Sequence, residues 1–106
     1  MKTGTILSAA VVAITAASFA APALADGKTL YLEKTCIACH GKDAKKPLTP
    51  EYPKLAGQNA KYAENQMKDI KSGARANGNT AAMKGIMHLV TDAEIKELAK
   101  YLSEIK

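Results

Sequence analysis

The C-terminal part of the chain carries the most regular apolar pattern. Just before it, Thr91-Asp92-Ala93-Glu94 forms a capping box, in which the Thr91 and Glu94 side chains accept hydrogen bonds from free backbone N–H groups. Apolar residues then recur at helical spacing on one face: Ile95, Leu98, Ala99, Leu102 and Ile105. The pattern predicts a helix that begins at the capping box and continues through Ile105.

A second amphipathic helix is predicted over residues 59–72. Asn59 is a residue type that caps helix N-termini, and Gly73 follows where a glycine commonly ends a helix. The expected apolar stripe of this helix consists of Tyr62, Ala63, Met67 and Ile70.

The remaining segments are shorter. A helix is predicted over residues 27–35, leading into Cys36, and a short helical turn over residues 82–89. Residues 41–57 are expected to form a loop, because their prolines are unsuited to a helix interior. These prolines are Pro47, Pro50 and Pro53. Residues 73–81 are small and polar and predict another loop. No segment indicates a strand, so the chain is expected to be all-α with about four helices.

The first 25 residues have the pattern of a secretory signal peptide. Lys2 is followed by an Ala-rich apolar run over residues 6–21 and by Ala23-Leu24-Ala25, a small-x-small cleavage signature. An uncleaved anchor is the alternative, but the run is rich in Ala and Ser rather than Leu and ends at the cleavage signature. We therefore expect residues 1–25 to be removed and residues 26–106 to form one periplasmic domain, with no stable membrane insertion.

The charge and the size of the chain limit the functional classes to which it can belong. The chain has 15 Lys and Arg against 10 Asp and Glu, a formal net charge of +5, and the positive residues are spread along it. Without a basic run, nucleic-acid binding is not indicated. A domain this short usually needs a stabilising group such as a metal or disulfides.

The two cysteines of the chain lie in Cys36-Ile37-Ala38-Cys39-His40, a Cys-x-x-Cys-His pattern typical of covalent haem attachment. Two thiols at this spacing add to the two haem vinyl groups as thioethers. His40 directly follows the second thiol, so its imidazole can turn under the ring and bind iron. The motif predicts one haem c with Cys36 and Cys39 as attachment points and His40 as an axial ligand.

Three other interpretations of the motif are weaker. A thioredoxin-like redox pair needs a βαβ context, which this pattern lacks. A structural zinc site needs four ligands, and His88 is the available fourth, but adjacent Cys39 and His40 strain a tetrahedron. A plain disulfide between Cys36 and Cys39 is the third alternative.

The chain from residue 26 onward resembles the class I bacterial cytochromes c, in particular the short c-553 type and single domains of the c-four type. The matching stretches are Cys36–His40, Tyr52-Pro53-Lys54-Leu55-Ala56-Gly57-Gln58, the helix over residues 62–73, and Met83-Lys84-Gly85. The resemblance implies a small all-α fold wrapped around one covalently bound haem. One departure is that residues 26–106 contain no Phe or Trp.

The resemblance also implies specific contacts. The Pro53 carbonyl would accept a hydrogen bond from His40, which fixes the tautomer of that imidazole, and Leu55 would pack on the haem. The terminal helices would cross at a close glycine–aromatic contact. The residues expected there are Gly27, Tyr31, Leu98 and Tyr101.

The candidates for the second axial ligand are Met67, Met83, Met87 and His88. Met67 falls on an apolar stripe, where a methionine usually belongs to the core. Met83 and Met87 are four residues apart and would face the same way on a helix. The resemblance favours Met83, with Met87 as second choice and otherwise a packing residue. His88 is expected at the surface. Arg75 either pairs with a haem propionate or is solvated.

These features predict an electron carrier rather than an enzyme, in which iron cycles between Fe(III) and Fe(II) with His/Met axial ligands. Exposed lysines would border the haem edge and attract acidic redox partners: Lys42, Lys45, Lys46 and Lys54. We expect a monomer or weak dimer. The alternatives are a haem subunit of a periplasmic oxidoreductase complex and, if neither methionine binds iron, an enzyme or gas sensor.

Overall fold

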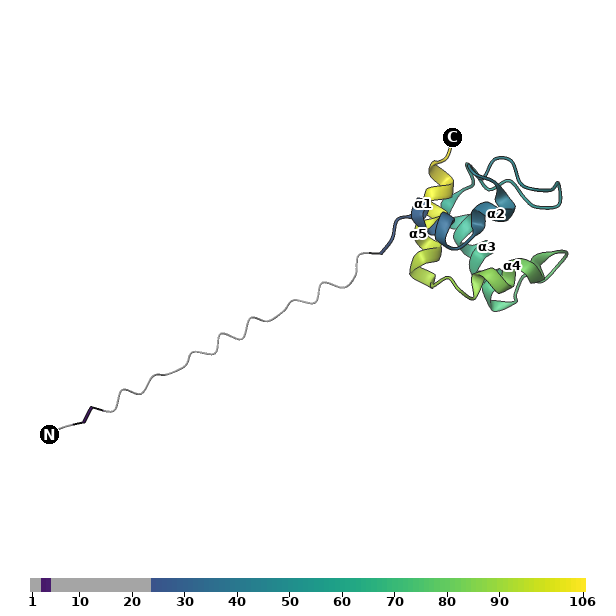
Figure 1. Ribbon diagram of the computed structural model, residues 1–106. Helices are drawn as coiled ribbons and strands as arrows, with labels where there is room; N and C mark the ends of the chain where they lie inside the picture. Colours follow the sequence, from purple (N-terminus) through teal and green to yellow (C-terminus); the bar gives the residue numbers. More distant parts are fainter. Residues whose placement is uncertain (1–2, 5–23) are drawn as a thin grey trace.

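The computed structural model describes residues 3–4 and 24–106, and the latter fold into five helices (Figure 1). These are α1 (Gly27–Glu33), α2 (Cys36–His40), α3 (Ala60–Ser72), α4 (Thr80–Met87) and α5 (Asp92–Glu104). Residues 24–106 contain no strand, so the all-α prediction is confirmed, with one helix more than expected. Within the same residues, no helix has the length and apolarity needed to cross a membrane. The predicted signal peptide lies outside the described residues except at positions 3, 4, 24 and 25.

Local sequence signals set the ends of α3 and α5. Both hydrogen bonds of the predicted capping box are present, at 2.9 Å from the Thr91 N–H to Glu94 and at 3.2 Å from the Glu94 N–H to Thr91. Asn59 caps α3 by accepting a hydrogen bond from the Tyr62 N–H at 3.0 Å. Gly73 ends α3 with a left-handed φ of 90°. The predictions made from capping residues are therefore confirmed.

Three predictions about the helices are wrong in detail. The helix predicted over residues 27–35 ends at Glu33, because Thr35 adopts a left-handed φ of 63° and turns the chain into the separate helix α2. Helix α4 begins at Thr80, inside the loop predicted over residues 73–81. The Tyr62 side chain is 53% exposed and does not belong to the core face of α3.

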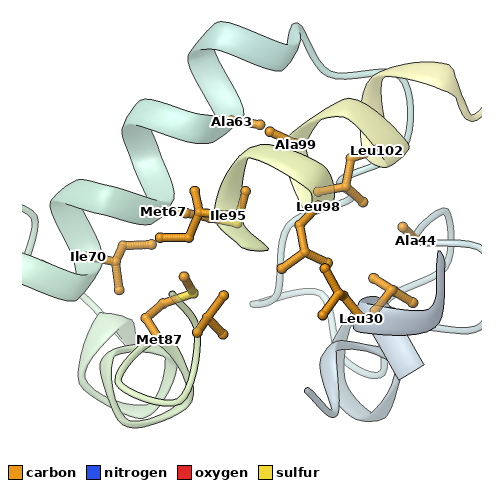
Figure 2. Packing of buried hydrophobic residues seen from close by; sticks show 12 residues of the cluster. Leu30, Ala44, Ala63, Met67, Ile70, Met87, Ile95, Leu98, Ala99 and Leu102 are labelled. Carbon is orange, nitrogen blue, oxygen red and sulfur yellow. The ribbon is translucent and has the colours of Figure 1, made fainter. Parts of the chain in front are cut away.

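Helix α5 lies at the centre of the domain and packs against α1 on one side and α3 on the other. Its buried side chains are Ile95, Leu98, Ala99 and Leu102. Figure 2 shows Ala63 of α3 facing Ala99 of α5, where two small side chains allow the helices to approach closely. The backbone of helix α4 lies close to that of α3 but not to those of α1, α2 and α5.

Helix α1 crosses α5 near its own first residue (Figure 1). A Cβ added at Gly27 would lie 2.4 Å from the Glu97 carbonyl oxygen, so only glycine permits this approach. The Tyr31 and Tyr101 rings then pack at a centroid distance of 5.8 Å and an angle of 56°. The glycine–aromatic crossing that the resemblance implied is present. It fixes α1, and with it the start of the cysteine-containing segment, against α5.

Candidate functional site

Helix α2 places both cysteines on one face, because residues three apart are neighbours on a helix. Both are partly buried free thiols. Burial is the main cause that raises the pKa of the Cys36 thiol to about 11. A disulfide-exchange cysteine needs a lowered pKa, so Cys36 does not have the environment of a thioredoxin-like nucleophile.

His40, which ends α2, is buried, with 6% of its surface exposed. Its Nδ1 atom lies 2.9 Å from the carbonyl oxygen of Pro53. A carbonyl oxygen can only accept, so Nδ1 carries the proton and donates it. The Nε2 atom of the neutral ring is then unprotonated and has a lone pair available for a metal ion. This is the contact that the resemblance implied.

The loop over residues 41–57 folds back so that Pro53 reaches His40. Gly41 begins it with φ of 88°, and a Cβ there would lie 2.1 Å from the Lys46 carbonyl oxygen. The Leu48 N–H donates to the Cys39 carbonyl at 2.9 Å. The N–H groups of Leu55 and Ala56 both donate to the Ala44 carbonyl, at 2.9 and 3.0 Å. The loop is thus held by backbone hydrogen bonds, which cannot be predicted from the pattern of side chains.

Tyr31 fixes the same turn from α1. Its hydroxyl donates to the Gly41 carbonyl oxygen at 2.5 Å, and its side chain is 1% exposed. Burial raises the pKa of Tyr31 to about 12. The sequence indicated Tyr31 as a helix-crossing residue but gave no sign of this hydrogen bond, which joins residues ten apart on different elements.

The other predicted site residues fall into distinct environments. Leu55 and Met83 are partly buried and pack, with Cys36, against the edge of the hydrophobic core. Met87 is 1% exposed and lies inside the core, next to Ile70 in Figure 2. The remaining candidates can be placed as follows: Met67 is buried in the core, His88 is exposed, and Arg75 donates to Gln66 at 3.1 Å.

The zinc hypothesis finds no support in the geometry. Among residues 3–4 and 24–106, no three or more His, Cys, Asp and Glu side chains are grouped so as to hold a metal ion. In particular, exposed His88 does not join Cys36, Cys39 and His40 in such a group. His40 is nevertheless oriented as a metal ligand, because its Nδ1 donates to Pro53 and its Nε2 does not.

The Cytochrome c family model matches residues 24–106. The chain belongs to the cytochrome c family. It is similar to cytochrome c-554(548) of Halomonas halodenitrificans, with 42% identity over 69 residues, 65% of this chain and 82% of that protein. It is 39% identical to cytochrome c4 of Pseudomonas aeruginosa over 71 residues, 67% of this chain but only 33% of that protein. The solved structure of reduced recombinant cytochrome c4 from Pseudomonas stutzeri matches with a TM-score of 0.67 and 28% identity, covering 76% of this chain and 46% of that chain.

This family membership establishes the class I cytochrome c fold and electron transfer through covalently bound haem c with iron. The residues of this cytochrome c fit that group. Two thiols on one face of α2 precede an imidazole whose Nε2 is free to ligate. Thr49 Oγ1, in the loop that carries Pro53, is also buried with no hydrogen-bond partner among the described residues, which leaves a polar group for an added acceptor or donor.

Proposed function

We propose that this chain is a periplasmic single-haem electron carrier with His/Met axial ligation. Cys36 and Cys39 would form the haem thioethers. His40 Nε2 would be one axial ligand of the iron, and the Met83 sulfur would be the other. The observation that carries the proposal is the hydrogen bond from His40 Nδ1 to the Pro53 carbonyl, 2.9 Å long. When bound, the haem supplies a one-electron Fe(III)/Fe(II) couple.

His40 and its partner determine one side of the iron. Because Nδ1 donates to Pro53, the ring cannot rotate freely and Nε2 becomes a more basic ligand. The histidine is nearly excluded from solvent, which limits competition from water. Leu55, directly after the Pro53–Lys54 pair and partly buried at the core edge, supplies apolar surface for haem packing.

Burial favours Met83 over Met87 as the second axial ligand. Met87 is 1% exposed and its side chain fills the core between α3 and α4, so binding iron would require it to leave that packing. Met83 lies one turn earlier on α4 and is only partly buried, so its sulfur is available to an added group. A thioether is a soft ligand and favours Fe(II), which suits a carrier of higher potential.

Partner docking is proposed at the loop next to the attachment motif. Four lysines of residues 41–57 are exposed: Lys42, Lys45, Lys46 and Lys54. Leu48 of the same loop, whose N–H bonds to the Cys39 carbonyl, is 72% exposed. A loop that exposes an apolar residue and four positive charges suits a transient acidic partner, which binds weakly and releases quickly.

The periplasmic location rests on the N-terminal pattern of residues 1–25 and is tested together with the haem. The protein is expressed with its own N-terminus and a c-type haem maturation system. We expect the denatured, acetone-extracted product to have the mass of residues 26–106 plus one haem. We also expect its oxidised spectrum to show a weak sulfur-to-iron band in the far red.

Two controls accompany this experiment. In Cys36→Ser/Cys39→Ser the haem should be lost by acetone extraction, because no thioether can form. A bare polypeptide mass for the wild type would contradict covalent attachment. Absence of the far-red band in a haem-loaded protein would contradict methionine ligation and support an open-site enzyme or gas sensor. Copurification with a catalytic subunit at fixed stoichiometry would instead support the alternative of an oxidoreductase subunit.

A further inference from the structure

Two lysines from different helices hold the α4–α5 link, residues 88–91, by its backbone. Lys34, the C-cap residue of α1, donates from Nζ to the Leu89 carbonyl oxygen at 2.9 Å. Lys71, in the last turn of α3, donates from Nζ to the Val90 carbonyl oxygen at 2.6 Å. Adjacent carbonyls of one short link are thus bound by ammonium groups that are 55 and 19 residues away in sequence.

Each ammonium group also faces a carboxylate in the first turn of α5. Lys34 lies 3.5 Å from Glu94, and Lys71 lies 3.5 Å from Asp92. The Asp92 side chain is 74% exposed, so that ion pair contributes little by itself. The two lysine side chains are only 24% and 30% exposed, and a charge-assisted bond to a carbonyl is the stronger interaction there.

The link is more important for the position of α4 than for the positions of the other helices. Among the described helices, only α3 has its backbone close to that of α4. Its C-terminal end is fixed on the apolar side by Met87 and Val90, each 1% exposed. On the polar side, the link is fixed by the hydrogen bonds from Lys34 and Lys71. Met83 lies one turn before Met87, so a shift of this end of α4 would move it directly.

We propose that Lys34 and Lys71 are positioning residues for the ligand-carrying helix α4: they hold its C-terminal end in place and thereby keep Met83 at the iron. The statement about Met83 rests on the proposed function, whereas the statement about α4 does not. Both ammonium groups are committed to backbone carbonyls, so these two lysines act within the domain and do not belong to the partner-docking set.

The variants Lys34→Met and Lys71→Met keep most of the aliphatic stem and remove the donors. The matched control is Lys68→Met, which removes the same charge one turn earlier on α3. Lys68 bonds to Glu64 at 2.9 Å, on its own helix, and donates to neither link carbonyl. Lys71→Arg retains both the charge and the donors, so it should hold α4 nearly as well as the wild type does. All variants are studied as haem-loaded protein.

The first readout is amide hydrogen exchange in α4. Loss of one charge-assisted hydrogen bond should speed exchange there by about fivefold for each single variant, and by more for the double variant. Exchange in α5 should change less, and Lys68→Met should match the wild type. If α4 exchange is the same in both link variants as in Lys68→Met, the positioning role is wrong. This readout does not depend on which residue binds iron.

The second readout is the rate of cyanide binding to the ferric protein, which requires the sixth ligand to leave. We expect about fivefold faster binding in each link variant and no change in Lys68→Met. Faster α4 exchange with unchanged cyanide binding would show that α4 is held by the lysines but does not control the sixth ligand, overturning that part of the inference. A wild type without a far-red band contradicts Met83 ligation itself, while the exchange data still decide the role of the lysines in holding α4.

Discussion

Gly27 lies so close to Tyr101 that a Cβ added to the glycine would be 2.3 Å from the tyrosine Cβ. No side-chain rotation relieves this overlap, because it involves a Cβ atom and, at Glu97, a backbone carbonyl. The contact joins the first residue of α1 to α5, and so connects the attachment motif to the centre of the core. Disrupting this contact should therefore lower the stability of the whole domain.

We therefore predict that Gly27→Ala destabilises the haem-loaded protein by about 3 kcal/mol or more, as expected for overpacking against backbone. The measurement is guanidinium unfolding followed by circular dichroism. Gly85→Ala is the control, since a Cβ there meets nothing within 4 Å and alanine suits a helix interior. It should leave the free energy of unfolding unchanged or raise it by up to about 1 kcal/mol. Equal effects of the two substitutions would show that the crossing tolerates a Cβ.

Replacement of the two methionines on α4 should have opposite consequences. Met83→Ala should abolish the far-red band, lower the reduction potential and admit cyanide or carbon monoxide, because a soft ligand is lost. Met87→Ala should keep the band and cost about 2–5 kcal/mol of stability, because it empties part of the core. Visible spectra and unfolding curves of both variants check this.

A ligand swap is the complication in that experiment, since Met87 lies one turn from Met83. The double variant resolves it, because neither sulfur is then present. If Met87→Ala alone loses the band, the assignment is reversed. If the double variant stays six-coordinate and low-spin, another strong ligand such as His88 is indicated, although His88 is exposed in the structure.

Tyr31 should make stability depend on alkaline pH. Its pKa rises from 10.0 to about 12 on folding, chiefly through burial, so the folded state favours the neutral phenol. The stabilisation is complete below pH 10 and is lost as the pH rises through 12. At about pH 8, Tyr31→Phe should be less stable by about 1 kcal/mol, because the Gly41 carbonyl loses its donor.

Between pH 10 and 12 this deficit should shrink and then reverse, since the Tyr31 phenol of the wild type ionises there in the unfolded chain while it stays neutral in the folded protein, and Tyr31→Phe has no such phenol. Unfolding free energies of both proteins across this range provide the test. Tyr62→Phe, at a side chain that is 53% exposed, should match the wild type at about pH 8 and controls for the loss of a phenol. A deficit that stays constant to pH 12 would mean that Tyr31 does not govern the alkaline loss.

The exposed lysines of residues 41–57 should make electron transfer sensitive to salt. With an acidic partner, the bimolecular rate should fall as ionic strength rises, because screening shortens the range of attraction. Lys45→Glu/Lys46→Glu should lower the low-salt rate and flatten the salt dependence. Lys100→Glu/Lys106→Glu, at two exposed positions near the C-terminus, is the control because it makes the same change in net charge. Stopped-flow rates that do not vary with salt in the wild type would exclude steering by these lysines.

Much of this protein could be predicted from residues close together in the sequence. Thr91 and Glu94 meet across a single helical turn, and Asn59 and Gly73 bound α3 through local backbone geometry, so these ends follow from sequence spacing alone. Cys36, Cys39 and His40 likewise specify haem attachment, because the chemistry needs those groups at that spacing.

Predictions from the sequence were wrong or incomplete where contacts between distant residues determine the local structure. The left-handed conformation of Thr35, which separates α1 from α2, has no preference in its own residue type. Helical periodicity places Tyr62 with Ala63, Met67 and Ile70, but only the last three are buried in the folded domain and Tyr62 remains exposed. Periodicity also puts Met83 and Met87 on one face, and only packing separates the core residue from the one at the core edge.

The sequence by itself thus determined the helical class, the helix ends with capping residues and the haem chemistry of the attachment motif. The family resemblance, rather than the residue pattern, implied the Pro53 carbonyl for His40 and the glycine at position 27. The tertiary structure alone decided where the Lys34, Lys71 and Tyr31 side chains bind. The physical reason is that all three depend on main-chain atoms from distant parts of the chain. Every residue offers a similar backbone carbonyl, so the sequence carries no mark of which one a folded side chain will meet.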